Sequence, residues 1–154
     1  HLRRQQSVLL HGDTGSGKSA IAQELLKLIS NEGKLCFYIP LITSRRPFLR
    51  DLLSQLSLYA DISFSQSQIY ADSTSIQTLL GEIYKAVSQL DKCICIIEVE
   101  RIIDSVKKDI LQFMQKGIIF ILISRSSSIK DLDDKLEKVR VEQLKEEDST
   151  LKTE

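Results

Sequence analysis

The sequence predicts an α/β fold, a three-layer α/β/α sandwich built on a mainly parallel sheet of five strands. Short apolar runs alternate along the chain with segments of helical period. Two of these runs, 93–97 (CICII) and 118–123 (IIFILI), are continuous and rich in isoleucine, as in strands that helices cover on both faces. Strands that alternate with helices are typical of a parallel sheet.

The expected strands are short and mostly apolar. They cover Ser7–His11, Leu35–Ile39, Cys93–Ile97, Ile118–Ile123 and, with a weaker pattern, Lys138–Val141. Pro40 is expected to end the second strand, because proline has no N–H to donate to a sheet ladder.

Helical segments are expected between the strands. In the first, residues 21, 25, 28 and 29 are apolar and share one face of a helix. Pro47 is expected to open the second, since proline is common in a first helical turn. The third is expected over 75–90 and the fourth over 104–115. The polar, serine-rich stretch 61–75 is expected to be a mobile surface loop.

The chain has 154 residues, about the length of one domain, and its hydrophobic fraction of 42% is ordinary for a globular protein. Lysine plus arginine and aspartate plus glutamate both number 21, so the net charge gives no general signal for nucleic acid or for an acidic membrane surface. Nucleic acid contact would need the local basic group Arg3, Arg4, Arg45, Arg46 and Arg50. No apolar stretch approaches the ~20 residues that cross a bilayer, so no membrane span is expected.

Cys36, Cys93 and Cys95 lie in apolar runs without a CxxC pair, which predicts reduced core residues of a cytoplasmic or nuclear protein. The chain begins at His1 rather than Met, so we expect either a piece of a longer protein or a processed chain. We expect residues 1–142 to form one nucleotide-binding α/β domain. Residues 143–154 are expected to begin an incomplete C-terminal helix or a linker to a lid domain.

The most informative motif spans residues 12–19, Gly-Asp-Thr-Gly-Ser-Gly-Lys-Ser, which matches GxxxxGK[ST] at every fixed position. An apolar strand precedes it and a helical segment follows it, as a phosphate-binding P-loop requires. Its glycines let successive backbone N–H groups point at phosphate oxygens, and the helix N-terminus favours the anion. The residues expected to line the nucleotide are Gly12, Asp13, Thr14, Gly15, Ser16, Gly17, Lys18, Ser19 and Ala20.

Two of these residues carry specific chemistry. Lys18 is expected to reach the β- and γ-phosphates as a positive charge, and Ser19 to offer its hydroxyl to Mg²⁺. The expected ligand is therefore ATP with magnesium. Asp13 and Thr14 occupy variable positions, to which we assign no chemistry.

Polar residues follow two further strands. Glu98 ends the third strand and is expected to hold magnesium, directly or through a water. Glu100 would polarise the attacking water only if the turn brings it back toward the phosphate. Ser124 and Arg125 end the fourth strand, where they are candidates to contact the γ-phosphate or the lytic water. Solvated side chains at loop starts are the alternative interpretation of Glu98, Glu100 and Arg125.

On these motifs the chain resembles the P-loop ATPases that have an extra strand between the Walker A and Walker B strands. It is most similar to the AAA+ and STAND branches, which include origin-recognition ATPases and NACHT or NB-ARC switch proteins. The resemblance implies an AAA+/RecA-like strand order, with Walker A at 12–19 and a Walker B-like strand at 93–98. Val99 departs from this pattern, because the position after the first Walker B acid is usually Asp or Glu.

Three functions remain open from the sequence. The first is an ATP-binding switch or assembly subunit of a larger complex, with ATP hydrolysis that is slow or completed by a neighbouring subunit. The second is a small-molecule kinase, whose lid arginines would be Arg45, Arg46 and Arg50. The third is an interaction subunit that binds nucleotide without hydrolysing it.

Overall fold

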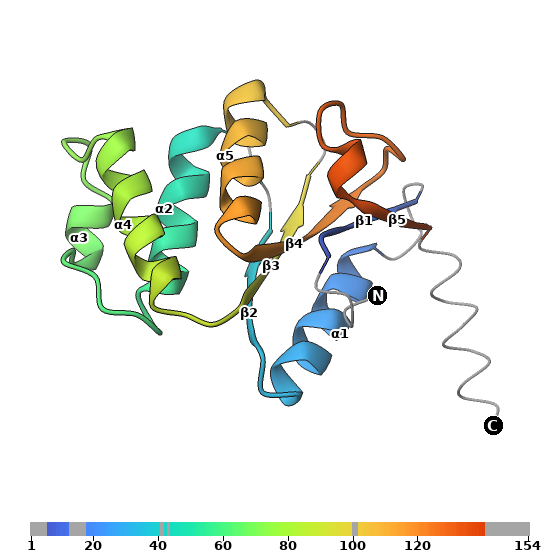
Figure 1. Ribbon diagram of the computed structural model, residues 1–154, viewed down its shortest axis with the longest axis horizontal. Coiled ribbons are helices and arrows are strands. Elements are labelled where there is room, and N and C mark those ends of the chain that lie inside the picture. The colour runs from blue at the N-terminus through green and yellow to red at the C-terminus, as the bar shows by residue number, and fades with distance from the viewer. Residues whose placement is uncertain (1–5, 13–17, 41, 43, 100–101, 141–154) are drawn as a thin grey trace.

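In the computed structural model, the described strands form one sheet in which every neighbouring pair is parallel. In chain order the strands are β1 (Val8–His11), β2 (Leu35–Ile39), β3 (Cys93–Glu98), β4 (Ile118–Ser124) and β5 (Glu137–Arg140). Their order across the sheet is β2-β3-β4-β1-β5, so β1 lies inside the sheet and β2 and β5 lie at its edges (Figure 1). The predicted α/β fold and five-stranded sheet are confirmed.

The structure describes residues 6–12, 18–40, 42, 44–99 and 102–140, apart from the side chains of Lys18 and Ser19. Within these ranges the helices are α1 (Lys18–Asn31), α2 (Arg45–Leu56), α3 (Gln66–Ile69), α4 (Ile76–Ser88) and α5 (Asp104–Gln115), with a short 3-10 helix at Asp133–Lys135. The predicted domain boundary after residue 142 and the segment 143–154 lie outside the described residues.

Two apolar clusters cover the two faces of the sheet, because successive strand residues point to opposite sides. Helix α1 packs on one face, and α2, α4 and α5 pack on the other (Figure 1). The α1 cluster includes Ile94, Ile96, Ile121 and Ile123. The opposite cluster includes Phe37, Cys95, Ile97 and Phe120, and extends through α2 and α4. This two-sided burial explains why β3 and β4 are apolar without alternation.

Helix α2 begins two residues earlier than predicted. It starts at Arg45, so Pro47 is its third residue rather than its first. Proline is still tolerated there, because the N–H groups of the first turn have no partner within the helix.

The stretch 61–75 is more ordered than its composition predicts. It contains α3, which begins with a capping box in which Ser65 and Gln68 exchange hydrogen bonds, and Ile69 is fully buried. At its start, Asp61 and Gln89 exchange two hydrogen bonds, from the Asp61 N–H (2.8 Å) and to the Asp61 carbonyl (2.7 Å). The segment is thus at the surface as predicted, but it contains a short helix and packs against the core through Ile69, Ile62 and Phe64. Its predicted mobility stays a prediction.

Arginines of α2 connect the helical insert between β2 and β3 to its surroundings. Arg46 donates to the carbonyl of Thr74, and Arg50 Nη2 donates to the carbonyl of Ala71 at 3.2 Å. Arg45 forms a two-pronged ion pair with Asp109 of α5, with N–O distances of 2.8 and 2.9 Å. Asp109 is only 2% exposed. These contacts join α2 both to the segment before α4 and to α5.

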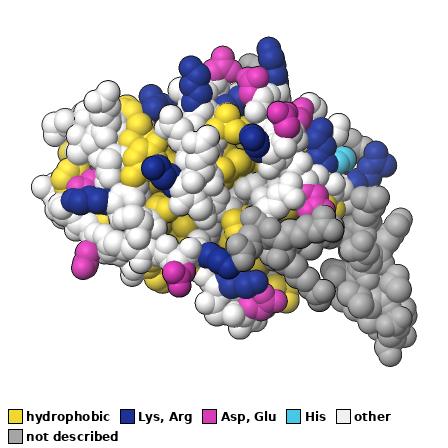
Figure 2. All heavy atoms as spheres, in the orientation of Figure 1, with side chains coloured by type: hydrophobic (Ala, Val, Ile, Leu, Met, Phe, Trp, Pro, Cys, Tyr) yellow, Lys and Arg dark blue, Asp and Glu magenta, His cyan; other side chains and the backbone are white. Residues whose placement is uncertain are grey.

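The molecular surface matches the balanced composition. On the face in Figure 2, basic and acidic side chains are interspersed over the described residues. Arg45, Arg46 and Arg50, three members of the local basic group predicted from the sequence, have partners within the protein. Arg3 and Arg4 lie outside the described residues. No described helix is both long and apolar enough to cross a membrane.

Candidate functional site

The carboxyl ends of β1, β3 and β4 meet at one edge of the sheet. His11, the last residue of β1, lies opposite Ser124 of β4, and Glu98 of β3 lies opposite Ile123. The N–H of Gly12 donates to the Ser124 carbonyl at 3.2 Å. Because β4 lies between β1 and β3, Glu98 is about two strand spacings, ~10 Å, from the end of β1. The sequence motif and its candidate partners thus reach the same edge.

The phosphate-binding motif has the strand–motif–helix context that it requires. It leaves β1 at the buried Gly12 and continues into α1, which begins at Lys18. The helix N-terminus contributes backbone N–H groups without helical partners at this edge. Residues 13–17 and the side chains of Lys18 and Ser19 lie outside the description. The predicted roles of these residues, and of Ala20 in the first turn, stay predictions.

Glu98 and Val99 have different surroundings. Glu98 follows Ile94 and Ile96 on the α1 face of β3 and is half-buried. Val99 is 3% exposed, packs in the cluster on the opposite face, and donates its N–H to the Ile123 carbonyl at 2.8 Å. A side chain at position 99 therefore points into the core rather than toward the motif. Glu100 lies outside the described residues.

Ser124 and Arg125 begin a turn that is tied together by hydroxyl groups. Ser124 is 3% exposed, and its hydroxyl accepts the Ser126 N–H at 3.1 Å. The Ser126 hydroxyl in turn donates to the Ser128 carbonyl at 2.8 Å. Arg125 is exposed. Ser124 thus lies beside the end of β1, and its hydroxyl also shapes the turn that carries Arg125. The predicted roles of Ser124 and Arg125 toward the γ-phosphate stay predictions.

Asp133 anchors the far side of this turn. Its carboxylate accepts from the Ser128 hydroxyl and from the Ile129 N–H, the latter at 2.8 Å. The hydrogen bond from Ser128 has the largest effect and that from Ile129 the next largest. Both lower the pKa of Asp133 below its ordinary value of 3.8, and Lys138 lowers it further. Asp133 was not predicted from the sequence, because its partners are side-chain and backbone groups of a turn that no motif marks.

Asp133→Asn is expected to destabilise the protein at pH 7 and to do so less at low pH. The lowered pKa means that the charged carboxylate stabilises the folded state above the unfolded-state value, and that this stabilisation disappears as pH falls through the folded-state value. Urea unfolding at pH 7, 5, 4 and 3 measures the difference from the unmodified protein. Asp134→Asn, on the neighbouring exposed aspartate, is the control. An Asp133→Asn difference that does not change with pH would contradict the assignment.

Tyr38 also lies near this edge, although the sequence did not indicate it. It is opposite Ile96 in the parallel β2–β3 pair, and Glu98 is two residues beyond Ile96, so both side chains lie on the same face of the sheet. Burial, followed by the interaction with Glu98, raises the pKa of Tyr38 to about 12. The tyrosine is therefore neutral at physiological pH.

The described residues contain no group of three or more histidine, cysteine or acidic side chains that is arranged to hold a metal ion. Magnesium does not require one, because it is usually bound through one or two protein groups together with phosphate oxygens and waters. Glu98, a half-buried carboxylate at the motif edge, is a donor of the kind that magnesium takes. The chemistry of the donor set therefore fits a magnesium–nucleotide complex, with Ser19 as the second predicted ligand.

The thiols have no role in this site. Cys36, Cys93 and Cys95 are free, and burial raises the pKa of Cys36 to about 12 and that of Cys93 to about 11. A raised thiol pKa disfavours the reactive thiolate. The prediction of unpaired core cysteines agrees with the structure, in which Cys36 is half-buried and the other two are buried.

Comparison with known proteins found one matching family model, described as AAA domain, over residues 2–145. No curated protein matches the sequence. Among solved structures, the genome packaging NTPase B204 from Sulfolobus turreted icosahedral virus 2, in complex with ATP-gammaS, is 13% identical with a TM-score of 0.45, over 79% of this chain and 66% of that one. The KaiC-like protein PH0186 from Pyrococcus horikoshii OT3 is 20% identical with a TM-score of 0.41, over 77% and 62% of the respective chains. The matched part of each of those structures is therefore somewhat less than two thirds of its length.

Proposed function

Because the chain belongs to the AAA domain family of P-loop NTPases, we propose that it binds ATP with Mg²⁺ on residues 12–20 and acts as a nucleotide-dependent switch or assembly subunit. The finer assignment to the AAA+ or STAND branches is part of this proposal. The observation that carries it is the convergence of β1, β3 and β4 at one edge, which brings Gly12, Glu98 and Ser124 together.

In this proposal the backbone N–H groups of the motif and of the α1 N-terminus bind the phosphates, and Lys18 adds a positive charge beside the terminal phosphates. Ser19 and Glu98 are the residues that would hold magnesium, Glu98 directly or through a water. When bound, the metal neutralises charge on the phosphate oxygens. Arg125, exposed on the turn after β4, is proposed to sense the γ-phosphate.

Hydrolysis is proposed to be slow or to need a neighbouring subunit. The position directly after Glu98 is a valine buried in the core opposite α1, so it supplies no carboxylate for activating water. Glu100 or a group from another subunit is then left to do so. Other copies or other chains are the proposed partners for the same reason.

Different observations distinguish the other two functions, a small-molecule kinase and a non-hydrolysing interaction subunit, from the proposed one. A small-molecule kinase would use Arg45, Arg46 and Arg50 over the phosphates, but all three contact the insert or α5. The same contacts speak against nucleic acid binding by these residues. A switch would change its contacts with partners when ATP is exchanged for ADP, whereas an interaction subunit that holds nucleotide without hydrolysis would not. The three free thiols fit a reducing compartment such as the cytoplasm or nucleus.

Calorimetric titration with ATP, ADP and GTP, each with magnesium, tests the proposal, with phosphate release measured in parallel. We expect ATP and ADP to bind and little phosphate to be released by the isolated chain. Absence of binding by any nucleotide would contradict the proposed function. Rapid phosphate release would instead contradict slow, partner-assisted hydrolysis while leaving ATP binding intact.

A further inference from the structure

The turn after β4 is held by a continuous series of hydrogen bonds that begins at the motif edge of the sheet. The Ser124 hydroxyl accepts the Ser126 N–H at 3.1 Å, so Arg125 is the middle residue of a tight turn closed by a side chain. The Ser126 hydroxyl donates to the Ser128 carbonyl at 2.8 Å and accepts the Ser128 N–H at 3.2 Å. The backbone that follows Arg125 is thus fixed through residues 126 and 128.

Asp133 is the carboxylate at the other end of this series. Its Oδ2 accepts the Ser128 hydroxyl, and its Oδ1 accepts the Ile129 N–H at 2.8 Å. Lys138 of β5 lies 3.3 Å from the same Oδ1. Both carboxylate oxygens therefore have donors, and hydrogen bonds to a charged acceptor are stronger than those between neutral groups. Asp133 thus ties the turn after β4 to the edge strand β5.

The end of the turn that Asp133 holds is anchored in the core. Ile129 is 8% exposed and Leu132 is fully buried, and both pack in the cluster that covers the face opposite α1. Between them, Asp131 has a φ of 73°, a left-handed conformation that is strained for a residue other than glycine. The chain keeps this conformation because buried and hydrogen-bonded residues on both sides hold it. The series of hydrogen bonds therefore connects Arg125 to a segment fixed by packing.

A fixed turn matters for Arg125 because a sensor arginine has to place a long side chain on one phosphate group. The side chain loses rotational entropy when it is held in one position, and freedom of its backbone would add to that loss. A turn that is already in place when ATP arrives lowers this cost. In the proposed site, the motif binds the phosphates that ATP and ADP share, whereas Arg125 meets only the γ-phosphate.

We propose that Asp133 is a positioning residue for Arg125, because through Ser128 and Ser126 it holds the turn after β4 in the shape that lets Arg125 reach the γ-phosphate. This role rests on the proposed function, and it adds a residue that none of the motifs contains. Asp133 acts through Arg125 and does not itself touch nucleotide.

The test is Asp133→Ala, which removes both acceptors from the turn. The measurements are the affinities for a non-hydrolysable ATP analogue and for ADP, each in magnesium. We expect binding of the ATP analogue to weaken about fivefold, on the scale of one hydrogen bond, and binding of ADP to stay unchanged. Loss of a negative charge would by itself favour an anionic ligand, so weaker binding reports the position of Arg125 rather than the charge of Asp133.

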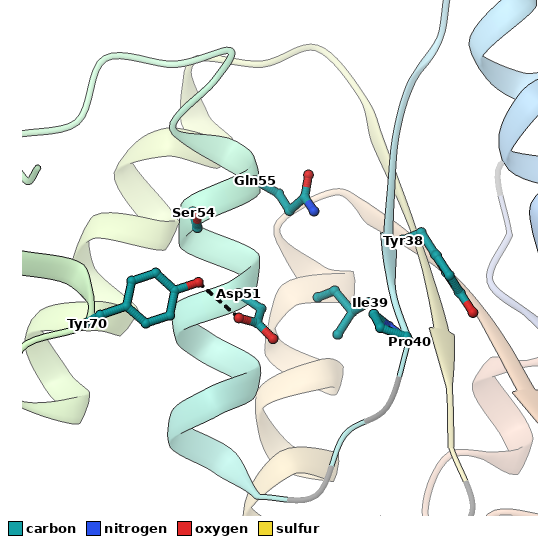
Figure 3. Close-up of a pocket in the computed structure, with 7 residues that line it drawn as sticks. All are labelled: Tyr38, Ile39, Pro40, Asp51, Ser54, Gln55 and Tyr70. Carbon is teal, nitrogen blue, oxygen red and sulfur yellow. Dashed lines mark hydrogen bonds between the residues drawn. The ribbon is translucent and has the colours of Figure 1, made fainter. Parts of the chain in front are cut away.

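Two variants serve as matched controls, and each should change neither affinity. Asp134→Ala removes an equal charge from the next residue, which is exposed. Tyr70→Phe removes another hydroxyl-to-carboxylate hydrogen bond, from Tyr70 to Asp51 at 3.0 Å, near the opposite edge strand β2 (Figure 3).

Ser128→Ala breaks the series one step nearer to Arg125 and leaves Asp133 with its contacts to Ile129 and Lys138. It should give a smaller loss, about two- to threefold, again only for the ATP analogue. Circular dichroism and urea unfolding check that each variant is folded, and Ser128→Ala carries the test if Asp133→Ala does not fold.

A double-mutant cycle separates positioning from a general structural effect. Arg125→Ala should weaken binding of the ATP analogue and not that of ADP. In the Arg125→Ala background, Asp133→Ala or Ser128→Ala should add no further loss, because the residue through which they act is absent.

Equal weakening of ADP and ATP-analogue binding would overturn the positioning role, because the effect would then be structural. Unchanged ATP-analogue affinity in the folded variants would overturn it too, as would losses that add to that of Arg125→Ala. Absence of nucleotide binding by the unmodified protein is a different result, since it removes the proposed function together with this role.

Discussion

Arg45→Met is expected to lower the free energy of unfolding by about 3 kcal/mol, because it leaves the Asp109 carboxylate without its cation. Asp109 is 2% exposed, and Arg45 donates two hydrogen bonds to its carboxylate, at 2.8 and 2.9 Å. Methionine fills much of the arginine volume, so the loss reports the charge rather than a cavity. Because the chain has no tryptophan, urea unfolding at pH 7 is best followed by circular dichroism.

The double variant Arg45→Met, Asp109→Leu should recover most of that stability, because it removes both charges together. Lys108→Met, at an exposed position beside Asp109 on α5, is the control and should change stability by less than about 0.5 kcal/mol. A single Arg45→Met variant as stable as the unmodified protein would show that solvent, rather than Arg45, compensates the buried carboxylate.

Lys18→Ala is expected to weaken the binding of magnesium–ATP at least about 100-fold, equivalent to ~2.7 kcal/mol. The motif requires a lysine at this position, which is the first residue of α1 at the motif edge of the sheet. Alanine removes the positive charge that we propose faces the phosphates, and it retains helix propensity. Isothermal calorimetry with a non-hydrolysable ATP analogue measures the change.

Lys27→Ala on the exposed part of α1 is the matched control, since it removes an equal charge from the same helix away from the motif. It should bind nucleotide like the unmodified protein. Equal affinity in Lys18→Ala and the unmodified protein would mean that nucleotide is held elsewhere or that the motif is unused.

The sheet could be predicted closely because its strands carry their own signal. The isoleucine-rich runs that became β3 and β4 are buried on both faces, and the predicted bounds lie within one residue of those observed. Helix α5 has the bounds that its apolar period predicts, Asp104–Gln115. The local sequence pattern was sufficient to predict an element wherever buried residues recur along it.

Helix α3 within the segment 61–75 was not predicted, because its formation depends on distant groups. Its apolar residues are isolated among polar ones, so no period identifies α3, and the contacts from Arg46 and Arg50 cross more than twenty residues of sequence. A composition rich in serine predicts a loop when the capping and packing partners are unknown.

In the candidate site, too, some residues could be predicted from local sequence and others could not. The motif at 12–19 and the acid at Glu98 were visible as sequence, and the structure adds the reason that Val99 is not an acid, namely its burial opposite α1. Tyr38 could not be predicted, since only the β2–β3 register brings it to the face of Glu98. Local sequence contains no information on which residues of separate strands lie opposite each other.

The internal position of β1, between β4 and β5, has a consequence for the order in which the chain folds. Both of its neighbours, β4 and β5, lie more than one hundred residues later in the sequence. Pairing over such a distance is slow, because a long loop must close before any contact stabilises it. During synthesis, β2, β3 and the helices between them can associate first, while β1 waits for β4 to emerge. The phosphate-binding motif is thus synthesised early, but the strands that pair with β1 beside it are synthesised late. A nascent chain therefore acquires its nucleotide site only when most of the domain has been translated.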